Sequence, residues 1–129
     1  MMWAADNQTI NLRMDIYGIK NCNTVKKALD WLKENHIEFN FHDFKKEGAS
    51  LEKLQEWSNK VGYEKLLNKQ GLTWKQLDAE TKATITGEKE ALQLLHDKNS
   101  MIKRPVLENK GFLILGFDKQ LYRKHFLSK

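Results

Sequence analysis

The sequence of 129 residues has one cysteine, one proline and no long apolar run. A single cysteine excludes an intramolecular disulfide and a four-cysteine zinc site, so the thiol serves either as a reactive group or in packing. No segment approaches the roughly 18 to 20 apolar residues of a membrane span, and the N-terminus lacks the pattern of a secretory signal. We therefore expect a cytoplasmic protein. The histidines, at positions 36, 42, 96 and 125, have no paired spacing such as H-x-x-x-H, so we expect no metal site.

The charged residues have a basic excess without a basic block. Lys and Arg number 22 against 17 Asp and Glu, which gives a net charge of +5. The lysines are spread along the whole chain among the acids, a pattern typical of a solvated surface more than of a nucleic-acid interface. The hydrophobic content of 40% is that of a compact soluble domain.

The first 43 residues predict a βαβ unit. No period is visible before Leu12, so we expect residues 1–13 to be a flexible extension and residues 14–129 to form a single domain. Alternating apolar residues predict a strand that ends at Gly18, and helical spacing predicts a helix over 23–35. Alternation over 37–41 then predicts a second strand, parallel to the first because of the crossover helix.

The middle of the chain predicts a helical insertion over about residues 46–99. The stretch "FKKEGAS" suggests a connecting loop, and Ser50 is a candidate N-cap for the next helix. Thr73 and Gln76 have the spacing of a capping box, and a last helix is predicted over 88–97.

The final third predicts a hairpin and a helix. Two short apolar runs flank "ENKG", with Asn109 and Gly111 as the residues suited to positive φ at the turn. Asp118 is the expected N-cap of a closing helix packed through Leu121, Tyr122 and Phe126. The element order therefore predicts an α/β chain with a thioredoxin-like fold, βαβ followed by ββα, with a helical insertion.

Cys22 lies between the first predicted strand and the first predicted helix. Unpaired N–H groups and the helix dipole at that place stabilise a thiolate and lower the pKa of a cysteine. Nearby side chains are expected to add positive charge or donate hydrogen bonds to the sulfur: Lys20, Asn21, Asn23, Thr24, Lys26 and Lys27. The alternative is a buried, inert cysteine.

Val25 occupies the position that the second cysteine of a C-x-x-C motif would take. A thiol that resolves a disulfide on Cys22 must therefore come from outside, most simply from glutathione as co-substrate. Arg104, just before Pro105, has the forked guanidinium that binds a carboxylate or an oxyanion. Its alternative role is a surface salt bridge.

The stretches "YGIKNCNTVKKALDWL", "LLNKQGLTW" and "IKRPVL" resemble the arsenate reductase ArsC/Spx family, and most of all its YffB-like branch. The likeness covers about residues 13 to 127. It implies a thioredoxin fold with a helical insertion, a nucleophilic Cys22, and Arg104 before a cis Pro105.

Arsenate reductases of this family carry two further arginines around the oxyanion, which this sequence lacks. Asn68 stands where the first is expected, and Gly116 or Phe117 where the second is expected. Less charge is then available to stabilise a bound arsenate. We therefore expect a glutathione-dependent thiol-disulfide oxidoreductase with Cys22 and Arg104 as catalytic residues, and with a substrate-binding set of Lys20, Asn21, Asn23, Thr24, Asn68 and Pro105.

Two other functions stay open. One is arsenate reduction coupled to glutathione and glutaredoxin. The other is an Spx-like regulator without enzymatic activity that binds the RNA polymerase α subunit.

Overall fold

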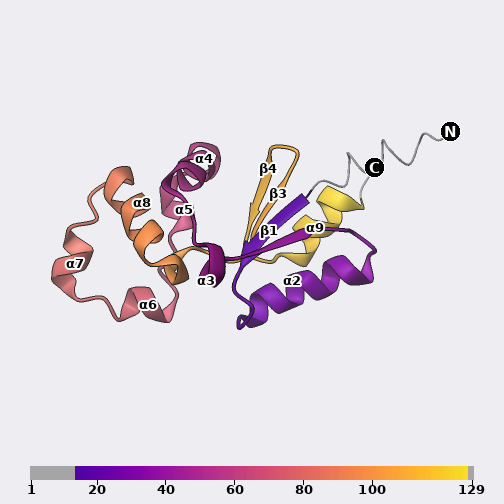
Figure 1. Ribbon diagram of the computed structural model, residues 1–129, viewed down its shortest axis with the longest axis horizontal. Coiled ribbons are helices and arrows are strands. Elements are labelled where there is room, and N and C mark those ends of the chain that lie inside the picture. The colour runs from indigo at the N-terminus through magenta and orange to yellow at the C-terminus, as the bar shows by residue number, and fades with distance from the viewer. Residues whose placement is uncertain (1–13, 128–129) are drawn as a thin grey trace. The chain divides into compact units, whose positions relative to one another are not determined.

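The computed structural model describes residues 14–127, so the predicted extension over 1–13 lies outside the described residues. The chain divides into two compact units (Figure 1). The first combines the segments up to Asp43 and from Arg104 onward, and the second is Phe44–Lys103. The second unit is thus an insertion that contains the predicted helical segment, while the single domain over 14–129 stays a prediction.

The first unit contains a four-stranded mixed sheet. Its strands are β1 (Met14–Gly18), β2 (Asn40–Asp43), β3 (Val106–Asn109) and β4 (Phe112–Leu115), and their order is β2-β1-β3-β4. β1 and β2 are parallel, whereas β3 is antiparallel to both β1 and β4. With α2 (Asn23–Glu34) and α9 (Lys119–Phe126), this gives the βαβ and ββα units of the thioredoxin-like fold, which confirms the predicted fold class.

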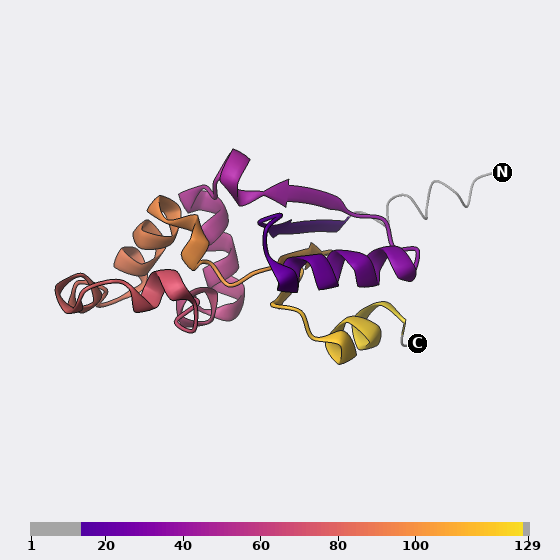
Figure 2. The same cartoon turned by 90° about the horizontal axis from the view of Figure 1, so that it is seen from below.

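Helices α2 and α9 cover one face of this sheet, and Figure 2 shows both on the same side. Burial of their apolar stripes against the inward side chains of the strands supplies the main stabilisation of the unit. The buried core consists of Met14, Ile16, Ala28, Trp31, Leu32, Leu107, Ile114 and Tyr122. Because inward residues alternate along each strand, the intervening residues lie on the other face.

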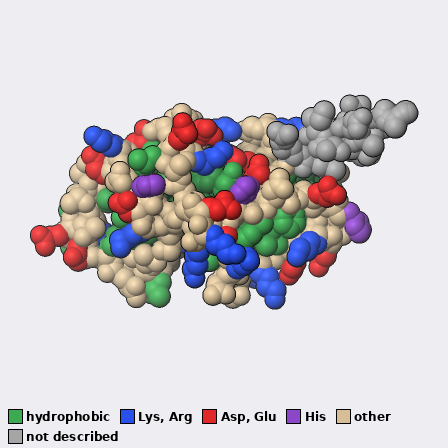
Figure 3. Space-filling model, viewed as in Figure 1, with side chains coloured by type: hydrophobic (Ala, Val, Ile, Leu, Met, Phe, Trp, Pro, Cys, Tyr) green, Lys and Arg blue, Asp and Glu red, His purple; other side chains and the backbone are tan. Residues whose placement is uncertain are grey.

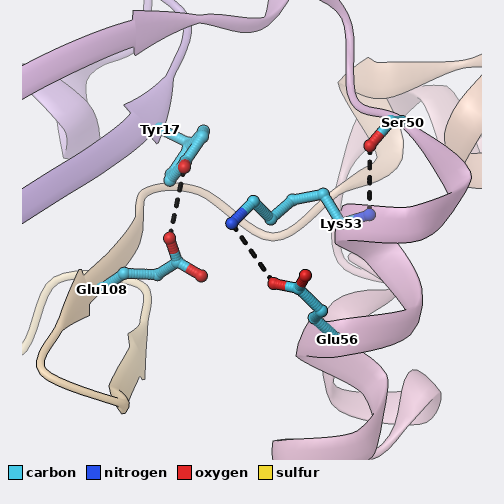
Figure 4. A network of polar contacts seen from close by, with 5 residues as sticks. All are labelled: Tyr17, Ser50, Lys53, Glu56 and Glu108. Atoms are coloured by element: carbon cyan, nitrogen blue, oxygen red, sulfur yellow. Dashed lines mark hydrogen bonds and ion pairs between the residues drawn. The ribbon is translucent and has the colours of Figure 1, made fainter.

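Those intervening residues include several polar side chains in contact. His42 Nε2 lies 2.8 Å from Asp15 Oδ1, and the His42 ring stacks on Tyr17 with centroids 4.4 Å apart. The Tyr17 hydroxyl donates a hydrogen bond of 3.2 Å to Glu108, as Figure 4 shows. The contacts follow from the register, which pairs Tyr17 with His42 and Asp15 with Glu108.

Two details of the first unit differ from the sequence-based expectation. The strand predicted over 37–41 begins only at Asn40, because the Ile37 N–H donates to Leu32 O and closes the end of α2. In the hairpin turn the residues with positive φ are Lys110 (54°) and Gly111 (82°), whereas Asn109 is still in the strand. A loop of two residues leaves Asn109 no role in the turn itself. The cap of α9 by Asp118 is confirmed.

The second unit is helical, as predicted. Its elements are α3 (Phe44–Glu47), α4 (Leu51–Val61), α5 (Tyr63–Leu66), α6 (Leu72–Lys75), α7 (Ala79–Ala83), α8 (Glu88–Asp97) and the 3₁₀ turn η1 (Asn99–Met101). Ser50 caps α4 by accepting a hydrogen bond of 3.0 Å from the Lys53 N–H, which confirms the predicted cap (Figure 4). The buried side chains of α4 and α8 include Leu54, Trp57, Ala91, Leu92 and Leu95.

Two predictions for this unit are wrong. The stretch taken as a loop contains α3, whose single turn is closed by the Gly48 N–H donating to Phe44 O. The capping box is absent because α6 begins after Gly71, which places Thr73 inside the helix. There its hydroxyl accepts a hydrogen bond from Ser100.

The surface carries charges of both signs. Figure 3 shows acidic and basic side chains across the face in view. This agrees with the interleaving of lysines and acids along the sequence.

Candidate active site at the start of helix α2

Cys22 is the N-cap residue of α2. Its backbone is extended, with φ of −130° and ψ of 121°, and its carbonyl accepts the first helical hydrogen bond from Lys26 N at 2.9 Å. The side chain is partly exposed. A side chain at this position faces the unpaired N–H groups of the first helical turn.

Gly18 allows the end of β1 to lie against the first turn of α2. A Cβ at this position would lie 2.8 Å from Val25 Cγ2, closer than real Cβ contacts. Because Gly18 has no side chain, the end of β1 can lie this close to the first turn of α2.

The electrostatics of the site favour a thiolate. Partial burial of Cys22 by itself raises the pKa, but the N–H of Val25, the guanidinium of Arg104 and the N–H of Thr24 together outweigh it. The pKa of the thiol is therefore lowered. Neither N–H forms a regular cap hydrogen bond to the sulfur.

Arg104 reaches this site through strand pairing. β3 begins at Val106, whose partner in β1 is Tyr17, so the residues before β3 lie beside the end of β1. The Arg104–Pro105 bond is cis, as the resemblance implied. Pro105 is buried, and its carbonyl accepts a hydrogen bond of 2.8 Å from the Gly116 N–H, which anchors the segment to the hairpin.

The remaining predicted residues fall into two groups. Lys20, Asn21, Asn23 and Thr24 are exposed and lie in the loop after β1 or in the first turn of α2, around Cys22. Asn68 belongs to the inserted unit, where its N–H donates to Met101 O at 2.8 Å. The contribution of all five side chains to substrate binding stays a prediction.

The sequence reasoning missed the backbone of Val25. Its N–H stands first among the groups that lower the pKa of Cys22. The signal was present, because the side chain of an N-cap residue faces the N–H groups two and three positions later. From the sequence, Val25 had two roles, as an apolar residue of the helix and as the residue in place of a second cysteine, and both concern its side chain.

Residues 14–127 contain neither a candidate metal cluster nor a candidate membrane span. No group of three or more His, Cys, Asp or Glu side chains in that range is arranged to hold a metal ion. Within the same residues no helix has the length and apolarity to cross a membrane.

The family model described as the ArsC family matches residues 17–125. The chain belongs to the ArsC family. An uncharacterized protein of Haemophilus influenzae is 38% identical over 111 residues, which are 86% of this chain and 96% of that protein.

Solved structures agree with this ArsC-family assignment. The YFFB protein is 41% identical with a TM-score of 0.80, over 84% of this chain and 95% of that one. An arsenate reductase (ArsC) related protein from Brucella melitensis is also 41% identical, with a TM-score of 0.71, over 89% and 95% of the two chains. The ArsC-family chain also matches two regulators, MgsR of Bacillus subtilis at 26% identity over 82% of this chain and 84% of that one, and Spx of Lactiplantibacillus plantarum at 23% over 84% and 83%.

Proposed function

We propose that this chain is a glutathione-dependent thiol-disulfide oxidoreductase in which Cys22 forms a mixed disulfide. The observation that carries the proposal is the Cys22 sulfur itself, partly exposed at the start of α2 with a lowered pKa and Arg104 beside it. The thiolate is the form of cysteine that attacks a disulfide, so a lowered pKa increases the reactive fraction near neutral pH.

The reaction balances with an external thiol. The Cys22 thiolate attacks the glutathione sulfur of a glutathionylated substrate, and the substrate leaves as a thiolate that takes up a proton. A second glutathione, as its thiolate, then attacks the glutathione sulfur of the mixed disulfide. Glutathione disulfide leaves and the Cys22 thiolate is regenerated. The substrate thiol is thereby freed and one free glutathione is oxidised, because the other half of the glutathione disulfide is the glutathionyl group that the substrate carried.

The side chains around the sulfur are suited to hold a peptide with carboxylates. Arg104 offers two parallel N–H donors to one glutathione carboxylate. Lys20 adds a positive charge, and Asn21 and Asn23 add amides that can hydrogen-bond the peptide backbone of glutathione. We place this activity in the cytoplasm, where glutathione is kept reduced.

The first test is the pH dependence of Cys22 alkylation by iodoacetamide. We expect a midpoint below that of a free cysteine, because the folded site stabilises the thiolate. Since the chain has no other cysteine, Cys22→Ser is a complete blank for the assay. A midpoint equal to that of a model thiol would contradict the proposal.

The second test is turnover. Reduction of a glutathionylated peptide is followed through NADPH in the presence of glutathione and glutathione reductase, and a glutathione adduct on Cys22 is sought by mass spectrometry. We expect turnover with an adduct in the wild type and neither in Cys22→Ser. Normal alkylation without turnover would show a reactive thiol with another substrate.

Arsenate serves as the contrasting substrate. Asn68 stands where one arginine of an arsenate reductase is expected, and Gly116 or Phe117 stands where the other is expected. We therefore expect no arsenate-dependent NADPH oxidation in a coupled assay with glutathione and glutaredoxin. Sustained turnover with arsenate would favour that activity instead.

A regulatory function is the second candidate, because the chain matches the regulators MgsR and Spx over more than four-fifths of its length. As such a regulator it would bind the RNA polymerase α subunit through its surface, without need of the thiol. The test is titration with the purified α subunit. Saturable binding that persists in Cys22→Ser, together with no glutathione turnover, would favour this function.

A further inference from the structure

Strand β4 is an edge strand of the sheet that residues 14–127 form, and it carries no charge. It reads Phe-Leu-Ile-Leu and lies within the uncharged stretch 111–117. The opposite edge strand, β2, reads Asn-Phe-His-Asp. Natural edge strands usually carry charged residues or proline that prevent pairing with another chain, and β4 has neither.

The hairpin register shows which backbone groups of β4 point away from β3. The pairs Asn109–Phe112 and Leu107–Ile114 flank the two-residue turn as hydrogen-bonded pairs, and the Gly116 N–H continues the pattern by donating to Pro105 O at 2.8 Å. Hydrogen-bonded pairs alternate in an antiparallel ladder. The N–H and C=O groups of Leu113 and Leu115 are therefore directed to the edge.

We propose that β4 pairs with β4 of a second copy of this chain, antiparallel about a two-fold axis at Ile114. In this register Leu113 of each copy lies opposite Leu115 of the other, and their outward N–H and C=O groups form hydrogen-bonded pairs. Such an interface is isologous, because the same edge meets itself and leaves no further edge open for growth at that side.

Charge complementarity favours a second copy over another occupant. Lys110 and Asp118 lie four residues before and four after Ile114. Lys110 lies in the turn before β4, and Asp118 lies beyond its other end. An antiparallel pair about this axis therefore brings the basic end of each strand to the acidic end of the other. The charges thus favour the antiparallel over the parallel arrangement of two copies.

Exposed apolar side chains lie next to the same edge. Phe112 is 48% exposed, and its ring packs on His125 of α9 with centroids 4.2 Å apart. Leu121, one helical turn before His125, is also 48% exposed. One pair of short strands buries less than the roughly 1,200 Å² of a standard stable interface, so the dimer is weak and depends on concentration.

Sedimentation velocity over a wide concentration range tests the proposal, with reductant present so that Cys22 cannot link two copies. We expect the wild type to shift from monomer to dimer as the concentration rises. The control variant Leu72→Lys, at a residue that is 69% exposed in the inserted unit, should shift in the same way. Leu113→Lys should remain monomeric at every concentration, because it places lysines in the paired edge. A wild type that stays monomeric, or a Leu113→Lys dimer, would overturn the proposal.

Amide exchange of the wild type gives a second readout that does not depend on a folded variant. The amides of Leu113 and Leu115 should gain protection as the concentration rises. Those of Phe112 and Ile114 already bond within the hairpin and should not change with concentration. Equal exchange of Leu113 and Leu115 at all concentrations would refute the pairing even where Leu113→Lys fails to fold.

Discussion

Tyr122 offers a direct test of how the core of the first unit is stabilised. The side chain is fully buried, and within residues 14–127 its hydroxyl has no hydrogen-bond partner. Its ring makes edge-to-face contacts with Trp31 and Phe117, at centroid distances of 5.5 Å and 4.9 Å. Tyr122→Phe keeps the ring and these contacts and removes only the unpaired hydroxyl.

The expected change is a gain in stability. A buried polar group without a partner costs about 1–3 kcal/mol, so Tyr122→Phe should raise the free energy of unfolding by about 1 kcal/mol. The matched control is Tyr17→Phe, since the Tyr17 hydroxyl donates to Glu108 at 3.2 Å. Loss of that hydrogen bond should lower the free energy of unfolding by about 0.5–1.5 kcal/mol.

The pH dependence provides an independent check. Burial raises the pKa of Tyr122 far above its usual value of 10.0, so above about pH 10 the unfolded chain releases this proton while the folded chain keeps it. The folded state then binds more protons, and stability falls as pH rises, by up to about 1.4 kcal/mol per pH unit from this group. Tyr122→Phe lacks this contribution and should lose less stability between pH 10 and 11.

Urea unfolding followed by circular dichroism measures all three proteins. We predict that Tyr122→Phe raises the free energy of unfolding and that Tyr17→Phe lowers it. A general effect of removing a hydroxyl would change it in the same direction in both variants. If Tyr122→Phe were destabilised as much as Tyr17→Phe, the Tyr122 hydroxyl would have a partner in solution, and the reasoning would be wrong.

Three further predictions concern the candidate site and the elements that position it. Arg104→Met should raise the pKa of Cys22 and move the alkylation midpoint to higher pH, whereas Arg104→Lys should restore part of the shift, as alkylation profiles will show. Ser50→Ala should lower the free energy of unfolding in urea by about 1 kcal/mol, because it removes the cap of α4. Gly18→Ala should cost about 1–3 kcal/mol through overlap with Val25, and adding Val25→Ala should recover part of that loss. Equal losses in the single and double variants would exclude the overlap as the cause.

The elements of the fold that the sequence predicted well are those with a strong local signal. α8 was expected over 88–97 and spans Glu88–Asp97, and the caps by Ser50 and Asp118 were read from residue types that favour that position. The short helices were less predictable. α3 has a single turn, and neither apolar period nor cap marks it before Gly48 ends it with φ of 70°.

The site was predictable for the residues that carry chemistry in their side chains. Cys22 and Arg104 stood out as the lone thiol and as a guanidinium next to the lone proline. Their proximity was not readable from spacing, because 82 positions separate them in the sequence and only the pairing of β1 with β3 joins them. The sequence indicated unpaired N–H groups at the start of the helix, but residue type did not show that the N–H of Val25 has the largest effect among them.

Val25 also bears on the proposal that an external thiol resolves a disulfide on Cys22. Its side chain is fully buried, and its Cγ2 lies so close to Gly18 that a Cβ there would be 2.8 Å away. Its N–H, in contrast, lowers the pKa of Cys22. A cysteine at position 25 would keep the N–H but would replace the packed isopropyl group with a thiol. One side chain at this position therefore cannot both fill the core as valine does and supply an internal resolving thiol. Because the Val25 side chain packs in the core, the mixed disulfide proposed on Cys22 would be resolved by a thiol from another molecule.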